Sequence, residues 1–299
     1  MRAAERIRNR IVAATTMLLA LAACSSHGPT ADPDATGPPV SSVPGAVPRP
    51  DHVLLVVLEN KDRSQVIGSP AAPYLTSLAH SGATFVDSRG IAHPSQPNYV
   101  ALLSGSTHGI TDDSCPQDLG AAPNLARALL DAGHTFVTYS ESMAGAGFTG
   151  CSAADGSYVR KHNPAADFSN IPAGSNRSYA QFPADYAALP TVSLLVPNMC
   201  HDMHDCPVST GDSWASAHLS GYAHWAMTHN SLLIVTFDED SGTPANRIPT
   251  IFAGPMVRPG PSKQPIDQYN LLRTLEDFFA LPPLGRAASA APITGIWRG

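Results

Sequence analysis

Charged residues are scarce in this chain. Only 14% of its 299 residues are Asp, Glu, Lys or Arg, and the formal net charge is −6 at pH 7. Proteins that bind nucleic acid neutralise its phosphates with clustered Lys and Arg, and this sequence has no basic stripe of that kind. The composition therefore excludes nucleic acid as an expected partner.

Long hydrophobic runs are also missing. The apolar run from Ile11 to Ala23 follows an arginine-containing start and is short for a membrane-spanning helix, but it is typical of a secretory signal. Because this run ends directly before Cys24, it resembles a bacterial lipobox. We expect a signal peptide over residues 1–23 and a lipid on Cys24. The alternatives are an ordinary signal peptide with a chance cysteine, or an uncleaved anchor.

Internal repeats and a second linker are absent too. Residues 24–50 consist mostly of Pro, Ser, Gly, Ala and Thr, and a segment of that composition cannot bury enough surface to fold. We interpret it as a flexible tether. The rest of the chain, residues 51–299, is long but continuous, which favours one domain of a size that α/β folds often reach.

Cysteine is rare, with five residues in all. Setting Cys24 aside leaves an even number, which suggests two disulfides in an exported protein. Cys200 and Cys206 are close enough in sequence to pair locally, which leaves Cys115 for Cys151. A zinc site is the competing interpretation, but the chain lacks the CxxC spacing that would support it.

Short apolar runs alternate with amphipathic segments through the domain. This alternation predicts an α/β three-layer sandwich with a mostly parallel sheet, since the runs are apolar on both faces. The expected parallel strands are residues 52–60, 83–88, 134–141, 191–198, 231–240 and 248–254, and the expected helices are residues 73–82, 123–133, 211–229 and 267–281.

Three of these strands end in acidic or amide side chains, and Asn198 is the last residue of the fourth. Glu59 and Asn60 follow the first strand, and Asp238 and Glu239 follow the fifth. Ligands in α/β sheets bind beyond the carboxyl ends of the strands, and buried carboxylates need a compensating cation. These four residues are therefore the expected ligands of a divalent metal ion. Otherwise they cap helices or pair with the cations Lys61, Arg63 and Arg247.

Ser95 lies in the segment HPSQPNY, just before the run VALLSG. Serine is a common helix N-cap, so capping is the simplest interpretation. The same position would also point helix N–H groups at a phosphate next to the hydroxyl, and Asn98 would add a donor. If a metal ion lies beside Ser95, the hydroxyl becomes a candidate nucleophile.

The segment CHDMHDC contains His201, Asp202, His204 and Asp205. Either histidine could bind a metal or a phosphoryl oxygen, or protonate a leaving alkoxide. The alternative is a surface loop whose histidines have no function.

A second polar segment, YVRKHNP, contains Arg160, Lys161 and His162. These side chains would suit a phosphate dianion, and a solvated basic turn is the alternative.

Seven segments taken in chain order resemble the bacterial phosphoesterase family that contains acid phosphatases and phospholipases C. The resemblance covers nearly all of residues 52–297. The segments are LEN at Leu58, HPSQPNY, YVRKHNP, PNMCHDMHD at Pro197, GDSWASAHL at Gly211, TFDEDSG at Thr236 and YNLLRTLEDFFALPPLG at Tyr269.

This resemblance implies an alkaline-phosphatase-like core, a divalent metal and a covalent phosphoryl-enzyme. By this resemblance Ser95 is the nucleophile, Asn98 contacts the phosphate and His204 contacts the phosphoryl group. The family's metal ligands match Glu59, Asn60, Asp238 and Glu239. Lys161, His162 and Asp205 complete the expected substrate-binding residues. The family pattern has an asparagine where this chain has His201.

The expected activity is hydrolysis of phosphate monoesters by an exported acid phosphatase. The segment DEDSGTPANRIP departs from the Gly-Phe-x-Asp-His segment usual in the phospholipase C members, which favours monoesters over diesters. A phospholipase C and a non-catalytic metal-binding lipoprotein are the alternatives. The expected substrate is a small phosphorylated compound such as a phosphoinositide, and the expected location is the outer face of the membrane, or outside the cell.

Overall fold

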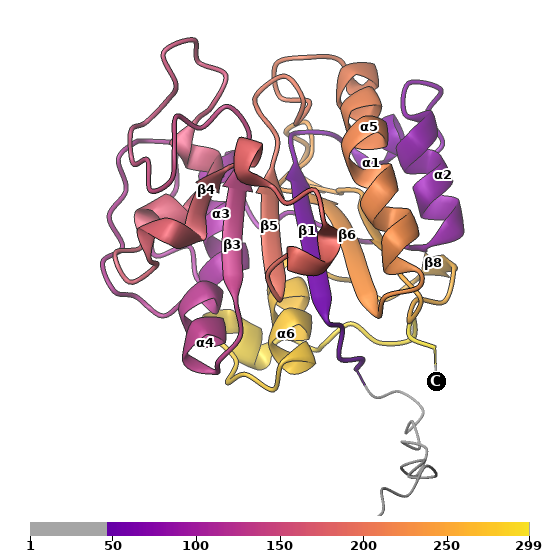
Figure 1. Ribbon diagram of the computed structural model, residues 1–299. Helices are drawn as coiled ribbons and strands as arrows, with labels where there is room; N and C mark the ends of the chain where they lie inside the picture. Colours follow the sequence, from indigo (N-terminus) through magenta and orange to yellow (C-terminus); the bar gives the residue numbers. More distant parts are fainter. Residues whose placement is uncertain (1–46, 299) are drawn as a thin grey trace, which may run out of the picture. The chain divides into compact units, whose positions relative to one another are not determined.

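The computed structural model describes residues 47–298. The predicted signal peptide, Cys24 and most of the predicted tether lie outside the described residues. The described part forms one eight-stranded sheet in the order β4-β3-β5-β1-β6-β7-β2-β8 (Figure 1). The strands are β1 (His52–Leu58), β2 (Ala83–Phe85), β3 (Phe136–Ser140), β4 (Asn176–Ser178), β5 (Val192–Val196), β6 (Ser231–Phe237), β7 (Thr250–Ala253) and β8 (Gly260–Ser262).

All strands except β7 run in one direction. β7 pairs antiparallel with β6 and with β2, whereas the other pairs are parallel. The mostly parallel sheet is confirmed, but the prediction of a parallel strand in residues 248–254 is wrong. Residues 238–249 contain no helix, so the chain turns back beside β6 instead of crossing over the sheet. β4 and β8 escaped prediction because they are short and polar.

Helices cover both faces of the sheet, which gives the predicted three layers (Figure 1). Leu54 and Val56 of β1 face one layer with α2 and α5, while Val53 and Leu55 face the other with α3, α4 and α6. Successive strand residues point to opposite faces, so an apolar strand of this kind needs helices on both sides. The helices are α1 (Arg63–Val66), α2 (Pro73–Ser81), α3 (Ser95–Ser104), α4 (Leu125–Asp131), α5 (Val208–Ala226) and α6 (Gln268–Phe278).

The four predicted helices correspond to α2, α4, α5 and α6. Short 3₁₀ turns occupy much of the segment between β3 and β5. In the part of the chain that is described, no helix combines the length and the apolar character that crossing a membrane requires.

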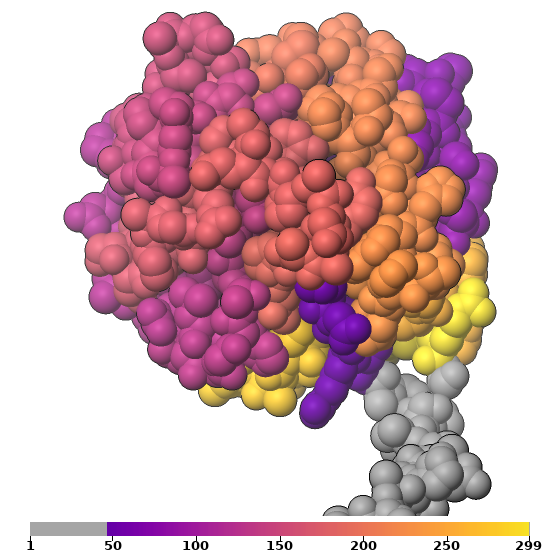
Figure 2. Space-filling model, in the orientation of Figure 1, coloured from indigo at the N-terminus to yellow at the C-terminus, as the bar shows by residue number. Residues whose placement is uncertain are grey.

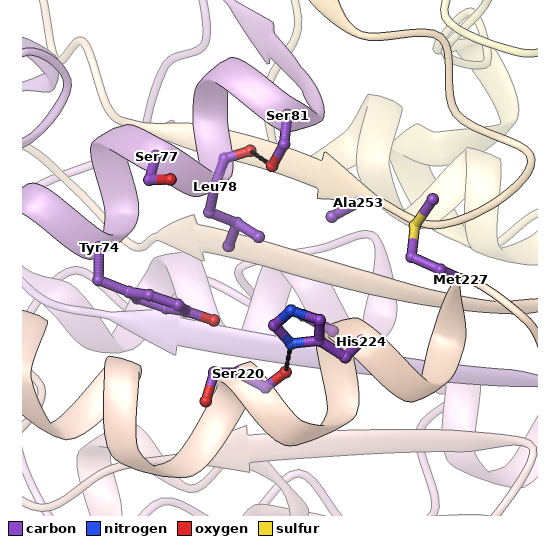
Figure 3. Close-up of a pocket in the computed structure, with 9 residues that line it drawn as sticks. Tyr74, Ser77, Leu78, Ser81, Ser220, His224, Met227 and Ala253 are labelled. Carbon is purple, nitrogen blue, oxygen red and sulfur yellow. Dashed lines mark hydrogen bonds between the residues drawn. The ribbon is translucent and has the colours of Figure 1, made fainter.

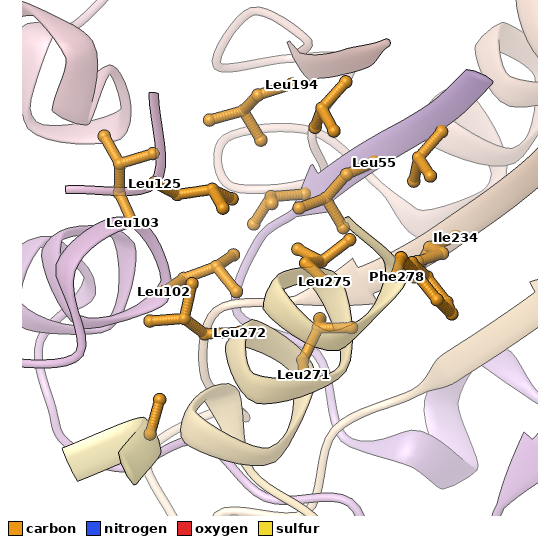
Figure 4. Close-up of a cluster of buried hydrophobic side chains, with 14 of the residues drawn as sticks. Leu55, Leu102, Leu103, Leu125, Leu194, Ile234, Leu271, Leu272, Leu275 and Phe278 are labelled. Carbon is orange, nitrogen blue, oxygen red and sulfur yellow. The ribbon is translucent and has the colours of Figure 1, made fainter. Parts of the chain in front are cut away.

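The core between the sheet and α3 fixes the position of that helix. Leucines of α3 and α6 meet side chains of β1, β5 and β6 (Figure 4). At the end of α3, Gly105 has a φ of 73°, and a Cβ there would lie 2.2 Å from the carbonyl oxygen of Leu284. Only glycine fits this close approach. The packing therefore anchors the whole helix, whose first residue is Ser95.

The register of β1 and β6 brings the predicted acidic residues to one edge of the sheet. Leu58 pairs with Phe237, so Glu59 and Asp238 leave the sheet side by side, and the Asp238 N–H donates to the Leu58 carbonyl at 3.1 Å. On the other side of β1, β5 leads into the loop that contains Asp202, whose carbonyl accepts from the Glu59 N–H at 2.8 Å.

Candidate active site

Four acidic side chains lie buried at the carboxyl edge of the sheet. These are Glu59 after β1, Asp202 in the loop after β5, and Asp238 and Glu239 after β6, and none is more than 5% exposed. Burial raises the pKa of Asp202 and of Asp238 to about 7, with the charge of Glu239 adding to the effect on Asp238. Burial also raises the pKa of Glu59 well above its ordinary value, assisted by the charges of Asp238 and Asp202.

The hydroxyl of Ser95 lies inside this acidic cluster. It donates to Glu59 Oε2 at 3.0 Å and lies 3.3 Å from Glu239 Oε1. The capping interpretation is wrong, because Pro94 holds the N-cap position of α3 and no side chain caps the helix. Ser95 is 1% exposed, so its hydroxyl is held among carboxylates instead of satisfying a backbone N–H.

Tyr99 and His162 border the cluster on the side of Glu59. Tyr99 donates its hydroxyl to Glu59 Oε1, and its ring stacks on His162 with centroids 5.2 Å apart. His162 Nε2 lies 3.4 Å from Glu59 Oε1, and Nδ1 lies 3.3 Å from Asp202 Oδ2. Burial lowers the pKa of His162 well below its ordinary value, with Lys161 and His204 adding to the shift. A neutral imidazole of this kind can bind a metal ion.

His204 approaches the same cluster from the loop after β5. Its ring centroid is 5.7 Å from that of His162, and its Nδ1 lies 2.7 Å from Asp205 Oδ1. Glu59, His162 and His204 each offer a ligand atom, and these atoms lie within 4.8 Å of one another. This set shares only Glu59 with the four ligands predicted from the sequence. His162, predicted to bind substrate, is thus also placed to bind a metal.

In the described residues no lysine or arginine pairs directly with the acidic cluster, although the charges of Asp202, Glu59 and Asp238 act on the nearby Lys61, whose pKa burial lowers. Among residues 47–298, no Lys or Arg lies within ion-pair distance of any of its four acids. The alternative that the acids pair with Lys61, Arg63 or Arg247 is therefore wrong. Arg63 donates to the Phe85 carbonyl at 2.9 Å, and Arg247 lies 3.7 Å from Asp87.

The donor atoms present fit a divalent cation. Asp202 Oδ2, Asp238 Oδ2 and His162 Nε2 are buried and have no hydrogen-bond partner within the described part of the chain. Buried carboxylates that lack any partner are costly, whereas a cation bound between them would satisfy both their charge and their free lone pairs. Carboxylate oxygens and imidazole nitrogens are common ligands of divalent transition metals and zinc.

Two predicted phosphate contacts also hold the chain around Ser95. Asn98 Oδ1 accepts from the N–H groups of Ile91 (2.9 Å) and Ala92 (3.1 Å), which fixes the loop before the serine. Lys161 Nζ pairs with Asp113 at 2.7 Å. The other oxygen of Asp113 accepts from the N–H of Gln96 at 2.9 Å, next to Ser95.

Arg160 has structural partners, and Asn60 contacts the acidic cluster through its backbone. Arg160 is buried, pairs with Asp167 at 3.0 Å and donates to three backbone carbonyls, a role that replaces the phosphate contact expected from the sequence. Asn60 has a φ of 53°, and its N–H donates to Asp238 Oδ1 at 3.2 Å.

Three residues of the site were not predicted. Tyr99 lies four residues after Ser95, and a helix places such a pair on one face, which is a usable signal. His93 hydrogen-bonds Glu239 through Nδ1 and lies 3.1 Å from the Thr243 carbonyl through Nε2. Burial alone would lower the pKa of His93, but these hydrogen bonds outweigh it and raise the pKa. Asp202 stood in the CHDMHDC segment without an assigned role.

The disulfides form as predicted. Cys115 pairs with Cys151 and Cys200 pairs with Cys206, with Cα separations of 5.8 and 4.7 Å. The second disulfide closes the loop that contains Asp202 and His204.

The sequence of this domain matches a known family over most of its length. The profile of the Phosphoesterase family aligns with residues 58–282, a span that includes all the active-site residues described above. The chain belongs to the Phosphoesterase family. This phosphoesterase is 47% identical over 262 residues to a phosphatidylinositol-3-phosphatase of Mycobacterium tuberculosis, and the alignment covers 87% of each chain.

A fungal relative extends the comparison. The phosphoesterase is 31% identical over 268 residues to a phosphate-repressible acid phosphatase of Penicillium chrysogenum, with 83% of this chain and 63% of the fungal protein covered. These relatives confirm the predicted class, a phosphoric monoester hydrolase.

Solved structures confirm the predicted fold. A protein of the alkaline phosphatase superfamily from Vibrio parahaemolyticus superposes with a TM-score of 0.57 and 12% identity, covering 84% of this chain and 72% of that one. The lipoteichoic acid synthase LtaP from Listeria monocytogenes gives a TM-score of 0.55 at 12% identity, covering 79% and 73%. At such low identity the likeness concerns the fold alone.

A separate hollow of about 300 Å³ lies between α2 and α5 of the phosphoesterase (Figure 3). Its lining contains no Lys, Arg or carboxylate, and His224 is its one imidazole. Its lining residues are Tyr74, Ser77, Leu78, Ser81, Ser220, Ala223, His224, Met227 and Ala253.

Proposed function

We propose that this phosphoesterase is an exported, metal-assisted acid phosphatase that hydrolyses phosphate monoesters through a phosphoseryl intermediate on Ser95. The observation that carries the proposal is the buried Ser95 hydroxyl, which donates to Glu59 and lies beside Glu239 in a cluster with no Lys or Arg ion pair in the described residues. Glu59, Asp238 and Glu239, with Asn60 and His162 close by, would hold the cation. When bound, it would lower the pKa of the serine hydroxyl and offset the negative charge of the phosphoryl group.

The nucleophilic step uses the contacts of Ser95. Its oxygen forms a bond to phosphorus while the bond between phosphorus and the leaving oxygen breaks. Glu59 Oε2 is the nearest acceptor for the hydroxyl proton. Because Tyr99 donates to the other oxygen of Glu59, the accepting oxygen stays directed at Ser95.

His204 completes the reaction. Asp205 binds its Nδ1, so Nε2 faces away from that contact and can give a proton to the leaving alkoxide. The same nitrogen then takes a proton from the water that attacks phosphorus and breaks its bond to Ser95. Phosphate leaves, and Ser95 regains its hydroxyl by taking back the proton that Glu59 had accepted.

The substrate and location form the finer part of the proposal. A relative named phosphatidylinositol-3-phosphatase supports a phosphoinositide head group as substrate, and the lipobox-like end at Cys24 supports a lipid anchor on the outer face of the membrane. The segment after Glu239 supports monoesters over diesters.

The test is Ser95→Ala in the metal-loaded protein. We expect phosphate release from p-nitrophenyl phosphate to fall at least about a thousandfold, since loss of a nucleophile removes the covalent route. Ser104→Ala is the matched control, because Ser104 is a buried serine at the other end of α3. If the Ser95→Ala variant retained most of the phosphatase activity, the proposed mechanism would be wrong. Faster hydrolysis of p-nitrophenylphosphorylcholine by the unmodified protein would instead identify a phosphodiesterase.

A further inference from the structure

Asp113 lies between helix α3 and the basic turn that contains Lys161. Its Oδ1 accepts from the N–H of Gln96 at 2.9 Å, and its Oδ2 accepts from Lys161 Nζ at 2.7 Å. Gln96 directly follows Ser95, and Lys161 directly precedes His162. One carboxylate therefore connects the backbone next to the nucleophile with the backbone next to a buried imidazole of the site, although none of the catalytic steps uses it.

Asp113 alters what the start of α3 can offer to a phosphate. The sequence suggests that the first N–H groups of this helix face the phosphate, because they have no partner within the helix. In the structure the Gln96 N–H donates to Asp113, and the next residue, Pro97, has no N–H. The first turn of α3 thus supplies fewer backbone donors than expected, so a bound phosphate needs side-chain donors.

Lys161 belongs to a long segment at one edge of the sheet. The chain between β3 and β5 covers the left side of the molecule (Figures 1 and 2), and much of it consists of short 3₁₀ turns. Within this segment Arg160 pairs with Asp167 and donates to three backbone carbonyls, so its guanidinium holds the fold. Lys161 instead contacts Asp113, which comes from a different segment. The Lys161–Asp113 pair therefore fixes the outer segment against α3.

The Lys161 ammonium keeps donors for a ligand. An ammonium has three N–H donors, and among the described residues Lys161 uses one of them, on Asp113. The side chains of Lys161 and Asp113 are 17% and 26% exposed, whereas the neighbouring Arg160–Asp167 pair is buried. A ligand that enters from solvent can consequently reach the ammonium.

Both charges of the pair act on the groups around Ser95. Burial lowers the pKa of His162, and the charge of Lys161 lowers it further while that of Asp113 opposes the shift. Burial also raises the pKa of Glu239, which lies beside the Ser95 hydroxyl, and the charge of Asp113 adds to that shift. The pair is therefore close enough to the acidic cluster to act on a phosphoryl group bound there.

We propose that Asp113 is a positioning residue that holds the Lys161 ammonium beside the phosphoryl group on Ser95, where Lys161 donates to a phosphate oxygen. The inference rests on the proposed function and adds a residue to its phosphate site. The charge of Asp113 by itself weakens the attraction between Lys161 and a phosphate dianion, so Asp113 contributes through geometry. A lysine side chain has many rotamers, and fixing one of them beforehand reduces the entropy that is lost when phosphate binds.

Asp113→Asn tests the proposal in the metal-loaded protein. The amide has only one oxygen, so it can accept from the Gln96 N–H or from Lys161 but not from both. We expect the Kd of inorganic phosphate, measured by calorimetry, to rise about fivefold to tenfold. KM for p-nitrophenyl phosphate should rise by a similar factor, while kcat should change less than about twofold, because Lys161 binds the phosphate equally in the substrate and the transition state.

Two further variants separate positioning of Lys161 from support of α3. Lys161→Met should raise the Kd of inorganic phosphate at least about tenfold, and adding Asp113→Asn to it should cause little further change, because Asp113 acts through Lys161. Asp112→Asn is the matched control and should leave the Kd unchanged. Asp112 is the exposed neighbour of Asp113, and it accepts from the N–H and the hydroxyl of Ser114.

Three outcomes would overturn the inference. A lower Kd in Asp113→Asn would show that Asp113 competes with phosphate for Lys161, and an unchanged Kd would show that it does not position the ammonium. An equal loss with and without Lys161 would show that Asp113 only supports α3. Phosphate binding needs no turnover and can be measured in the Ser95→Ala variant as well. Failure of the proposed function, seen as retained activity of Ser95→Ala, is therefore distinguishable from failure of this inference.

Discussion

Ser95 depends on side chains from distant parts of the chain for its surroundings. Glu59 comes from the end of β1 and Glu239 from the end of β6, while Tyr99 comes from the same helix as the serine. Each acid raises the energy of the others when no cation is bound, because like charges in a buried site repel. The effects of substitutions here should therefore depend on whether the metal is present.

Asp238→Asn tests this dependence. We expect activity to fall by about two orders of magnitude or more, because a buried oxygen without a protein partner is replaced by an amide nitrogen that cannot bind a cation. Chelation should lower the free energy of unfolding of the unmodified protein by about 2.7 kcal/mol where free metal was a hundredfold above its Kd. The variant should show little further loss on chelation. Thermal unfolding with and without chelator measures both effects.

Asp240→Asn is the control for that experiment. Asp240 is buried next to the cluster, but it accepts from the N–H groups of Gly242 and Thr243. We expect this variant to lower the melting temperature equally with and without metal. If the unmodified protein keeps full rate and stability after exhaustive chelation, the site does not use a metal.

At the scale of elements, the two disulfides serve different purposes. Cys200–Cys206 spans six residues of sequence and holds the loop with Asp202 and His204, whereas Cys115–Cys151 spans 36. Closing a longer loop removes more entropy from the unfolded chain, about 4 kcal/mol for the long connection and about 2 kcal/mol for the short one. The short disulfide thus contributes more to geometry than to stability.

Paired serine variants separate these roles. Replacing Cys200 and Cys206 should lower kcat/KM by about tenfold with a small change in melting temperature, because loss of orientation in a catalytic group is costly in rate. Replacing Cys115 and Cys151 should lower the melting temperature more and the rate less. Phosphate release and thermal unfolding of the two variants provide the comparison. The reverse pattern would show that the short disulfide does not position the loop.

Helix α6 carries a buried acid with no catalytic role. Glu276 Oε1 accepts from the N–H of Leu284 at 2.8 Å, and Oε2 is buried without a partner. Burial raises the pKa of Glu276 from 4.5 to about 7. The folded state therefore holds this proton more tightly than the unfolded chain, so the stabilisation is complete below pH 4.5 and is lost as the pH rises to about 7.

Glu276→Gln should remove this pH dependence. Relative to the variant, the unmodified protein should lose at most about 3 kcal/mol of stability between pH 4.5 and 7, at about 1.4 kcal/mol per pKa unit. Denaturant unfolding at several pH values measures the difference in free energy of unfolding between the two proteins. The acids of the metal site titrate in both proteins, so their effect cancels in this difference. Asp277→Asn, a partly exposed neighbour paired with Arg273, should behave like the unmodified protein. A flat difference across this range would contradict the prediction.

At the scale of the whole molecule, the sheet separates the start of the domain from its chemistry. β1 begins at His52, close to the predicted tether, and ends at Glu59 in the acidic cluster. Each residue of a strand advances the chain by about 3.3 Å, so the two ends of β1 lie on opposite edges of the sheet. The proposed anchor at Cys24 and the active site can therefore be altered independently.

Cys24→Ser tests the proposed anchor. We expect the protein to move from the membrane fraction to the soluble fraction with unchanged kcat/KM, because the lipid supplies membrane affinity and takes no part in catalysis. Cell fractionation followed by phosphatase assay of each fraction measures this. Retention of the variant in the membrane would contradict lipidation at Cys24.

Some features of the protein follow from local sequence alone. The alternation of apolar strands and amphipathic helices specifies the layers, since each pattern has only one way to bury its apolar side chains. The acids that end β1 and β6 were identified in the same way, because parallel strands with apolar faces must end at a shared edge. The disulfide pairing followed from the short spacing of Cys200 and Cys206, which left Cys115 for Cys151.

Other features were decided only by the tertiary structure. The sequence could not show that β7 runs antiparallel, because an apolar strand reads the same in both directions. His162 and Lys161 are adjacent in one basic turn, yet burial places the first against Glu59 and leaves the second paired with Asp113. The sequence of Ser95 fits a helix N-cap, but in the structure Pro94 is the N-cap and Ser95 is the first residue of α3. Its hydroxyl therefore points toward the acids. In each case the outcome depends on contacts between distant segments, which local patterns do not encode.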